Sequence, residues 1–410
     1  MNIFKYTLLI VLLFLVSCTS TEKDFVGDIT LLVSTNVRGQ LDPCGWKKNP
    51  LGGLSRKSTY VKQLNNKGKN LVILDAGDLL FNNSVLVDEQ LEADKLRAQT
   101  LIKGYETIGC DVVNIGGFDL AAGIDYLTQV VDSTNIPFIS ANIIDSKTKK
   151  NLFPPHHIIK NSGISIGVIG LTNLLPSHVR EVKIEDFISV GKAQIAELRN
   201  KVDIIVVLAN VNRDKNKIMN EEFVDADYIF ISRNTVKTRP GAEQPLNGPF
   251  TYGSNIQGKY LAQIDISITE IDSPLVDVSN LHTQIDNIDK RLERFQNKDP
   301  NKSLEDIYAD QPRIIKLIGD LTQNRETFEK NLQIAKNTSS YKSVPLSRKI
   351  EDDQIMLAYV TEVLQQCEAL TKTKPKKNLI KNPKDFEKNL KKGLKSGWIL
   401  GCLLFKFLYY

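Results

Sequence analysis

The sequence predicts an α/β protein in which a layered sheet domain is followed by a helical arm. Short apolar runs alternate with helix-like segments from Asp28 to Ile268, which is the pattern of strands connected by helices. Several of these runs end in polar residues beside a glycine, as in the stretch 75–78. From about Pro274 the apolar residues instead recur at alternating steps of three and four, which is typical of amphipathic helices.

The order of the elements follows from where the apolar runs and the helical periodicities fall. Apolar runs rich in Val, Ile and Leu, bounded by polar residues or glycine, predict buried strands. The predicted strands are 28–34, 71–75, 110–114, 136–142, 164–171, 202–208, 228–231 and 260–268. Helical segments follow most of the strands, and they are predicted from Ser55 onward and at 86–109, 123–131 and 190–201.

The chain after Pro274 predicts an antiparallel helical hairpin over 275–336. One apolar stripe occupies 278–295, the residues 299–301 break the helix, and a second stripe occupies 307–332. Pro312 is predicted to interrupt the second helix near its start. Two interpretations of this arm stay open: a packing element on the sheet domain, or a coiled coil that docks a protein partner.

The segment 338–370 is predicted to return to the main domain, with a strand at 341–346 and an amphipathic helix at 352–370. The remainder, 371–410, combines ten lysines between Lys372 and Lys395 with an apolar end at 397–410. That end is shorter than the roughly 20 residues that cross a membrane. It is either an interfacial segment drawn to anionic lipid or the product of an early stop or frameshift.

Charge argues against a nucleic acid as partner. The chain carries 53 Lys and Arg against 48 Asp and Glu, which gives a net charge of +5. Because ten of the lysines lie in the tail, the folded part is close to neutral and offers no basic face.

Residues 1–17 have the organisation of a bacterial lipoprotein signal peptide. Lys5 supplies a positive charge, 8–16 form an apolar stretch, and the residues 15–18 (Leu-Val-Ser-Cys) resemble a lipobox. We therefore expect lipidation of Cys18 and anchoring in the cell envelope, with Thr19 favouring the outer membrane and a periplasmic orientation. The alternative is an ordinary secretion signal with an incidental cysteine. In an oxidising periplasm a disulfide between Cys44 and Cys110 stays open, although the cysteines show no metal-binding spacing.

One predicted strand, 71–75, places a carboxylate where ligands usually bind. The strand ends in a glycine turn that delivers Asp78 at the carboxyl edge of the sheet. Such a carboxylate either bridges metal ions or caps the next helix.

Taken together, these stretches resemble the calcineurin-like metallophosphoesterases, in particular their 5′-nucleotidase branch. The resemblance implies a four-layer α/β/β/α sandwich over 28–270 into which the antiparallel helical hairpin is inserted. It rests on Thr35-Asn36-x-x-Gly39-Gln40, Leu51-Gly-Gly-Leu-Ser-Arg56, Leu74-Asp-Ala-Gly-Asp78, Phe118-Asp119, Pro137-Phe-Ile-Ser-Ala-Asn142 and Gly167-Val-Ile-Gly-Leu-Thr172.

The resemblance also implies a chemistry. Enzymes of this family hold two divalent metals, such as manganese, zinc or magnesium, which lower the pKa of a bridging water and clamp the phosphate. Their ligand blocks are Asp-x-His, Gly-Asp, Gly-Asn-His-Glu, a lone His, and Gly-His-x-His. Carboxylate and neutral imidazole groups are needed because they offer lone pairs to the metal.

This chain keeps few of those ligands. Asn36 and Arg38 stand at the Asp and His positions of the first block, and an arginine cannot ligate a cation. Asp78 remains in the second block. The other substitutions are Ile115, Gly116 and Gly117 for the Asn, His and Glu of the third block, Asn210 for the lone His, and Arg233 for a His of the last block.

Histidines are missing from every ligand block. Asp119 matches the family residue that orients the catalytic histidine, but Gly116 leaves it nothing to orient. The four histidines of the chain lie elsewhere: His156, His157, His178 and His282. We therefore expect no metal ion or other cofactor.

The favoured hypothesis is a catalytically degenerate, 5′-nucleotidase-like lipoprotein that acts as a binding or scaffold protein at the envelope. If Arg38 and Arg233 both point into the former metal cleft, two guanidiniums replace two metal ions and hold a phosphate-like anion. Surface arginines, or arginines paired with Asp78, are the simpler alternative.

Two other hypotheses compete with it. The first is an active metal-dependent phosphoric ester hydrolase, similar to 5′-nucleotidases, with a reduced metal site formed by Asn36, Asp78 and Asn210. The second places the function in the helical arm and the basic tail, as a contact to a partner or to the membrane.

Overall fold

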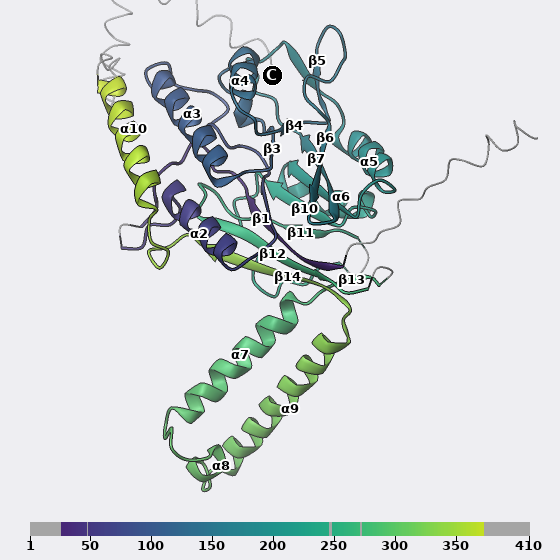
Figure 1. Cartoon of the computed structure of the whole chain (residues 1–410), viewed down its shortest axis with the longest axis vertical. Helices are drawn as coiled ribbons and strands as arrows, with labels where there is room; N and C mark the ends of the chain where they lie inside the picture. Colours follow the sequence, from purple (N-terminus) through teal and green to yellow (C-terminus); the bar gives the residue numbers. More distant parts are fainter. Residues whose placement is uncertain (1–25, 47, 246–247, 271–272, 373–410) are drawn as a thin grey trace, which may run out of the picture.

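The computed structural model describes residues 26–46, 48–245, 248–270 and 273–372. Two packed β-sheets form the body of the molecule, helices cover both outer faces, and a helical hairpin projects from one side (Figure 1). The hairpin is inserted between β12 (Tyr260–Ile268) and β14 (Asn337–Pro345), which are neighbours in one sheet. The predicted four-layer α/β/β/α sandwich with an inserted hairpin is therefore confirmed.

The first sheet has seven strands in the order β13-β14-β12-β1-β2-β3-β4. Its parallel half consists of β1 (Gly27–Ser34), β2 (Leu71–Asp75), β3 (Val112–Asn114) and β4 (Phe138–Ile139). β12 pairs antiparallel with both β1 and β14, and β13 (Leu275–Asp277) forms the edge. The helices on its outer face are α2 (Leu54–Asn66), α3 (Leu91–Ile108), α4 (Ile124–Asp132) and α10 (Gln354–Lys372).

The second sheet has five strands in the order β11-β10-β9-β7-β6. They are β6 (His156–Asn161), β7 (Ile164–Thr172), β9 (Ile204–Asn210), β10 (Tyr228–Ser232) and β11 (Phe250–Tyr252), all parallel except β6. α5 (Phe187–Leu198) and α6 (Asn216–Glu222) cover its outer face. A small separate ladder pairs β5 (Ile143–Asp145) with β8 (Val182–Ile184).

The strands of the sandwich are buried on both faces, which explains their continuous apolar sequences. Along β1, Leu31 and Val33 pack between the two sheets, whereas Leu32 packs against the outer helices. Along β9, Val206 faces the other sheet and Val207 faces α5 and α6. Because side chains alternate between faces, a strand with apolar neighbours on both sides shows no polar alternation.

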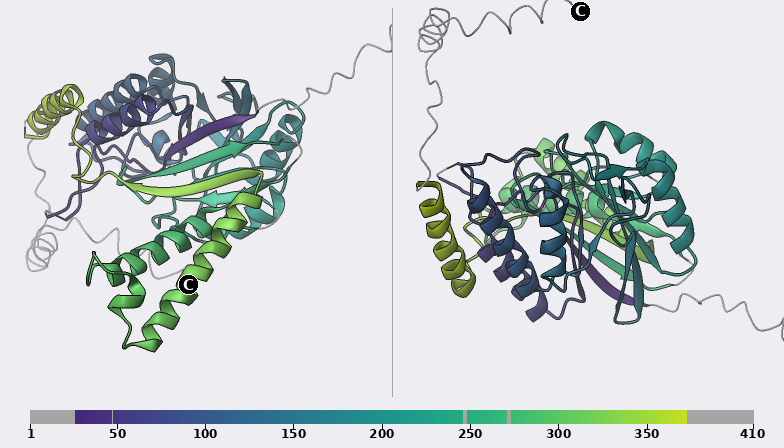
Figure 2. Two further views of the ribbon diagram at one scale, coloured as in Figure 1. Left: turned by 60° about the horizontal axis from the view of Figure 1, so that its bottom comes forward. Right: turned by 90° about the horizontal axis from the view of Figure 1, so that it is seen from above.

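The hairpin consists of α7 (Ser279–Gln296) and α9 (Pro312–Ile334), with the short α8 (Leu304–Ile307) at its tip (Figure 2). The helix predicted from 307 is interrupted near its start as expected, because α8 ends at Ile307 and α9 begins at Pro312. At that position the missing N–H leaves no helical bond unmade, and the fixed φ of proline favours the helix start. Arg325 on α9 pairs with Asp289 on α7 at 2.6 Å.

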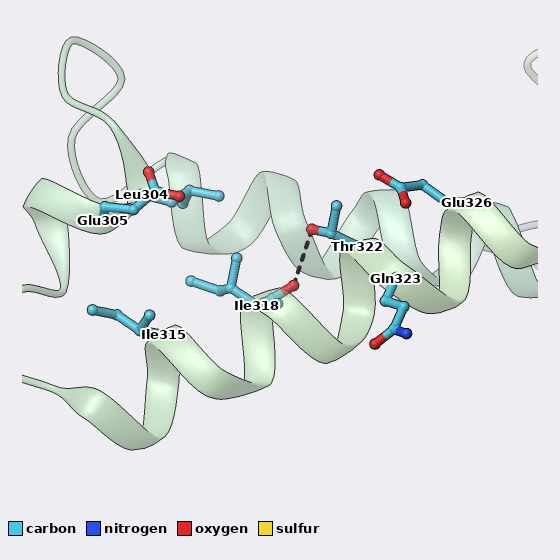
Figure 3. A pocket seen from close by; sticks show the side chains of 8 residues that line it. Leu304, Glu305, Ile315, Ile318, Thr322, Gln323 and Glu326 are labelled. Carbon is cyan, nitrogen blue, oxygen red and sulfur yellow. Dashed lines mark hydrogen bonds between the residues drawn. The ribbon is translucent and has the colours of Figure 1, made fainter.

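A hollow of about 370 Å³ lies near the tip of the hairpin. The side chains of Leu304, Ile315 and Ile318 lie around the space between α8 and α9 (Figure 3). Glu305 and Glu326 add carboxylates to its lining. The hollow contains no basic side chain, so it is unsuited to an anion.

Three details of the sequence interpretation need correction. The segment 86–90 precedes α3 rather than belonging to it, since α3 begins at Leu91. The predicted strand 136–142 shrinks to Phe138–Ile139, partly because Pro137 has no N–H to donate. The returning strand begins earlier than expected, at Asn337, whose side chain accepts from the N–H groups of Thr269 and Glu270.

The disulfide left open between Cys44 and Cys110 does not form, because the two thiols have separate partners. Cys44 Sγ donates to Gln257 Oε1 at 3.4 Å, whereas Cys110 is buried beside the Ile73 carbonyl. Burial raises the pKa of Cys110 to about 12, which keeps it an unreactive thiol.

None of the described helices is long and apolar enough to cross a membrane. The predicted signal peptide 1–17, the lipidation site Cys18 and the tail beyond 372 lie outside the described residues.

Two helical glycines provide a test of this packing. A Cβ at Gly104 on α3 would come within 2.2 Å of Leu54 Cδ2 on α2, whereas a Cβ at Gly319 on α9 would meet nothing within 4 Å. We expect Gly104→Ala to lower the free energy of unfolding by about 1–3 kcal/mol through overpacking. Gly319→Ala should raise it by about 1 kcal/mol, since alanine is the better helix former. Urea unfolding measures both, and equal effects would contradict the packing of α2 on α3.

Candidate functional site

The strand ends of both sheets meet at one buried cluster of polar side chains. Asn36 follows β1 and is fully buried, and its Oδ1 accepts from the backbone N–H of Arg233 after β10 at 2.7 Å. Its Nδ2 donates to the Asn255 carbonyl at 3.0 Å. This side chain therefore joins loops from the two sheets and has no free oxygen directed at a ligand.

Asp78 and Asn210 are held by two consecutive backbone amides. Asp78 Oδ1 accepts from the N–H of Phe118 at 2.9 Å, and Asn210 Oδ1 accepts from the N–H of Gly117 at 2.8 Å. Asn210 Nδ2 donates to Ser232 Oγ at 2.7 Å. Asp78 and Asn210 therefore lie beside consecutive amides of one turn, and the oxygens that accept these bonds are used by protein.

The turn that supplies these amides can pack close to Asp78 and Asn210 because residues 116 and 117 are glycines. A Cβ at Gly116 would lie 2.3 Å from the Asp78 backbone nitrogen and 2.8 Å from Asn210 Nδ2. A Cβ at Gly117 would lie 2.5 Å from the side chain of Leu174. A histidine at position 116 therefore has no room in this arrangement. The sequence interpretation saw only lost ligands here and missed that the glycines permit a close backbone approach.

Asp119 has a role that the sequence interpretation did not foresee. Its carboxylate accepts from three backbone N–H groups: Leu80 at 2.7 Å, Gly116 at 2.8 Å and Asp78 at 3.0 Å. Burial, followed by the charge of Asp78, raises the pKa of Asp119 to about 8, and the N–H groups of Leu80 and Gly116 oppose that rise. With no histidine to orient, Asp119 instead ties the 116–118 turn to the loop after β2.

The backbone at this site is strained at several non-glycine residues. Asn36, Arg38, Asp78 and Arg233 all adopt left-handed conformations, with φ between 51° and 64°. Such conformations cost about 1 kcal/mol or more each and persist where the surrounding structure determines them. Their concentration at the strand ends makes this cluster the candidate functional region of the fold.

Arg38 and Arg233 both lie against the ring of Phe118. Their guanidinium carbons are 5.1 and 5.5 Å from the ring centroid, and both side chains are partly exposed. Arg233 Nε also donates to Asn212 Oδ1 at 3.0 Å. The two arginines, from loops of different sheets, are therefore brought together beside Asp78.

Three polar atoms of this group have no hydrogen-bond partner although they are buried: Arg38 Nε, Arg233 Nη1 and Asp78 Oδ2. The charges of both guanidiniums act on Asp78, yet the groups do not bond to one another. Burial raises the pKa of Asp78, while the N–H of Phe118, the charge of Arg233, a hydrogen bond from the Asn210 side chain and the charge of Arg38 act in the opposite direction. Unpaired buried groups of this kind are rare in native proteins, and a bound water molecule or ion is one explanation for them.

Sequence comparison finds relatives among nucleotide-hydrolysing enzymes, although no protein-family model matches the chain. A 5′-nucleotidase of Vibrio cholerae is 29% identical over 209 residues, which cover 48% of this chain and 36% of that protein. A 2′,3′-cyclic-nucleotide 2′-phosphodiesterase/3′-nucleotidase of Yersinia enterocolitica is 27% identical over 291 residues, covering 60% of this chain and 44% of that protein. The chain thus spans less than half the length of these curated relatives.

Solved structures show the same fold. A 5′-nucleotidase precursor from Thermus thermophilus superposes with a TM-score of 0.57 at 14% identity, over 83% of this chain and 59% of that one. A calcineurin-like phosphoesterase from Bacillus subtilis, YfkN, superposes with a TM-score of 0.58 at 12% identity, over 85% of this chain and 100% of that one. The chain is a relative of the 5′-nucleotidase branch of the calcineurin-like phosphoesterases. The resemblance seen in its motifs is therefore confirmed.

The residues of this phosphoesterase relative do not fit the paired metal centre of the family. Within the described ranges, no group of three or more His, Cys, Asp and Glu side chains is placed to hold a metal ion. The amide oxygens of Asn36 and Asn210 are used by backbone donors. His156 contacts Gln194, and His178 contacts the Ala121 carbonyl, so neither faces the site. Two guanidiniums beside Asp78 would also repel a cation.

The close approach of the 116–118 turn generates a prediction. Gly116→Ala places its Cβ against backbone, which cannot rotate away, and we expect it to lower the free energy of unfolding by about 3 kcal/mol. Gly117→Ala meets the Leu174 side chain, which can adopt another rotamer, and we expect a loss of about 1 kcal/mol. Chemical denaturation of both variants measures the difference. If Gly116→Ala left the free energy of unfolding unchanged, the turn would not approach Asp78 in this way.

Proposed function

We propose that this chain is a catalytically inactive relative of the 5′-nucleotidases that binds a phosphate-like anion through Arg38 and Arg233. The observation that carries the proposal is the pair of guanidiniums beside Asp78, with buried N–H groups that no protein atom accepts. Charge-assisted hydrogen bonds from arginine to an oxyanion are among the strongest in proteins. The protein would act as a binding or scaffold component of the bacterial cell envelope.

The hydrogen bonds already described support the loss of hydrolysis in this proposal. Phosphoester cleavage in the family depends on a metal-activated water, and the positions that would hold the metals contact backbone amides or are occupied by arginine. The arginines can stabilise a bound anion but cannot generate a hydroxide, because a guanidinium keeps its proton at neutral pH. Binding without turnover is the outcome that these groups support.

The competing candidate is an active hydrolase with a reduced metal site. One observation favours it, since Asp78 is retained at its family position and its Oδ2 has no partner. A single carboxylate oxygen with two neighbouring cations is a poor metal ligand, however. We therefore place this hypothesis second.

A hydrolysis assay separates the two candidates. With a chromogenic phosphomonoester and added manganese, zinc or magnesium, we expect no turnover above that of the buffer with metal alone. Turnover that Asp78→Ala abolishes, in a variant that still unfolds cooperatively, would establish the hydrolase instead.

Calorimetry tests the anion site directly. We expect inorganic phosphate to bind, and Arg38→Gln and Arg233→Gln each to weaken binding by about 10- to 100-fold, as the loss of a charge-assisted hydrogen bond predicts. Arg313→Gln, on the exposed surface of α9, is the charge-matched control and should leave the affinity unchanged. Absence of heat at millimolar phosphate would reject the anion site.

In this proposal the hairpin binds a protein partner, and the lipid anchor keeps the protein at the membrane. The hollow at the hairpin tip, with the apolar side chains of Leu304, Ile315 and Ile318 and acidic side chains beside them, would give a protein partner a recess to bind. Lipidation at Cys18 would hold the protein at the membrane. Replacing 279–334 with a short turn should remove co-purifying proteins while phosphate binding persists. Unchanged co-purification would count against the arm as a partner site.

A further inference from the structure

The helical hairpin leaves much of its apolar surface uncovered. Of the apolar side chains on its two long helices, the described chain buries only Ile288 on α7 and Ile318 and Leu321 on α9. Others, such as Ile315 and Phe328, stay half-buried. The hairpin projects away from the sheets (Figure 2), and an apolar stripe on such a helix is normally covered by another helix.

The hollow near the hairpin tip follows one side of α9 for about three turns. Its lining runs along α9 from Ile315 through Gly319 to Glu326, with Leu304 and Glu305 of α8 across from it (Figure 3). Side chains spaced three and four residues apart on one helix form the kind of groove into which a second helix packs. The shape of the hollow therefore favours a helix as its occupant.

Gly319 lies in this groove, and no atom of the described chain requires a glycine there. A Cβ at Gly319 would meet nothing within 4 Å, although alanine is the better residue inside a helix. The distance between two packed helix axes depends on the side chains at their contact. A glycine at this position therefore allows the axis of a second helix to come close to α9.

The charges beside the groove match when the same face is placed against itself. Arg325 is used within the hairpin, where it pairs with Asp289. Arg313 and Glu326 are exposed, and neither takes part in an ion pair with another described residue. Two α9 helices that cross antiparallel at Gly319 place Glu326 of one copy within one residue of the level of Arg313 of the other. The two-fold axis then repeats this pair.

The net charge and the size of the hairpin also fit a second copy of the chain. The residues 279–334 contain nine Lys and Arg against ten Asp and Glu, so two hairpins do not repel one another strongly. One face of two neighbouring helices of this length is about 35 Å long and 20 Å wide, on the order of 700 Å². Specific interfaces bury roughly 800 Å² on each partner.

We infer that this face of the hairpin is an interface between two copies of the chain, in which the two α9 helices cross antiparallel at Gly319. The inference rests on the proposed role of the hairpin as a protein-binding arm and deepens it by naming the partner. In this arrangement Ile315 of each copy faces the groove of the other. The half-buried apolar side chains of the hairpins then become the core of a four-helix assembly.

Sedimentation equilibrium of the full chain, in a mild non-ionic detergent because lipidation is predicted, tests the interface. We expect the protein mass to rise from one chain to two over roughly 1 to 100 μM, the weak end of the affinities that interfaces of this size show. Ile315→Glu places a carboxylate in the groove and should weaken association by about 100-fold. Ile334→Glu, the same substitution at an exposed position of α9 outside the hollow, should leave association unchanged.

An exchange of charges tests the antiparallel crossing. Glu326→Arg opposes two arginines at both ends of the interface and should weaken association by about tenfold. Glu326→Arg combined with Arg313→Glu restores opposite charges across the interface and should recover most of the wild-type affinity. A double variant that associates no more tightly than Glu326→Arg alone would contradict the crossing at Gly319.

The outcomes separate the failure of this inference from the failure of the proposed function. A chain that stays monomeric at every concentration would overturn the inference. So would a dimer that persists in Ile315→Glu, with the variant shown by circular dichroism to be folded. If other proteins then still co-purify only when 279–334 is present, the hairpin keeps its proposed role and only the named partner is wrong. Phosphate binding is measured separately and depends on neither result.

Discussion

The hydrogen bonds from the backbone amides of Gly117 and Phe118 to Asn210 and Asp78 determine what the rest of the site can do. Each of these side chains has a peptide N–H as its partner at 2.8–2.9 Å, at a position that the motif resemblance aligns with a metal ligand of the family. A peptide dipole offers a partial positive charge, so it replaces part of the attraction that a cation would supply. The turn can come so close only because position 116 has no side chain.

The other features of the site depend on this arrangement. With the turn in place, Phe118 presents its ring between the loops that carry Arg38 and Arg233, and both guanidiniums pack on it. Asp119 stabilises the turn by accepting from three backbone N–H groups. The left-handed residues at the strand ends persist because the buried hydrogen bonds of Asn36 and Asp78 keep the loops in position.

Much of the fold was predictable from sequence because both sheets bury their two faces. The strands predicted at 71–75 and 260–268 have the same first and last residues in the structure. The heptad-like spacing after 275 predicts the hairpin. The errors fall where local pattern carries little information. The strand at 136–142 was overextended because an apolar run does not reveal which residues find a ladder partner.

The site was predictable in its members but not in its contacts. That Asn36, Asp78, Asn210 and Arg233 lie together follows from the motif order and the parallel strand ends. The glycines at 116 and 117 were interpreted as losses, since no sequence pattern shows how near a backbone approaches. The role of Asp119 was missed for the same reason, because its partners are backbone amides, which every sequence possesses.

Amide hydrogen exchange at Gly117 and Phe118 tests the central claim most directly. If these amides replace metal ions as partners of Asn210 and Asp78, both should exchange slowly in protein treated with a chelator, and added zinc or manganese should leave the rates unchanged. Rapid exchange in the chelated protein, followed by a large change when metal is added, would contradict the account.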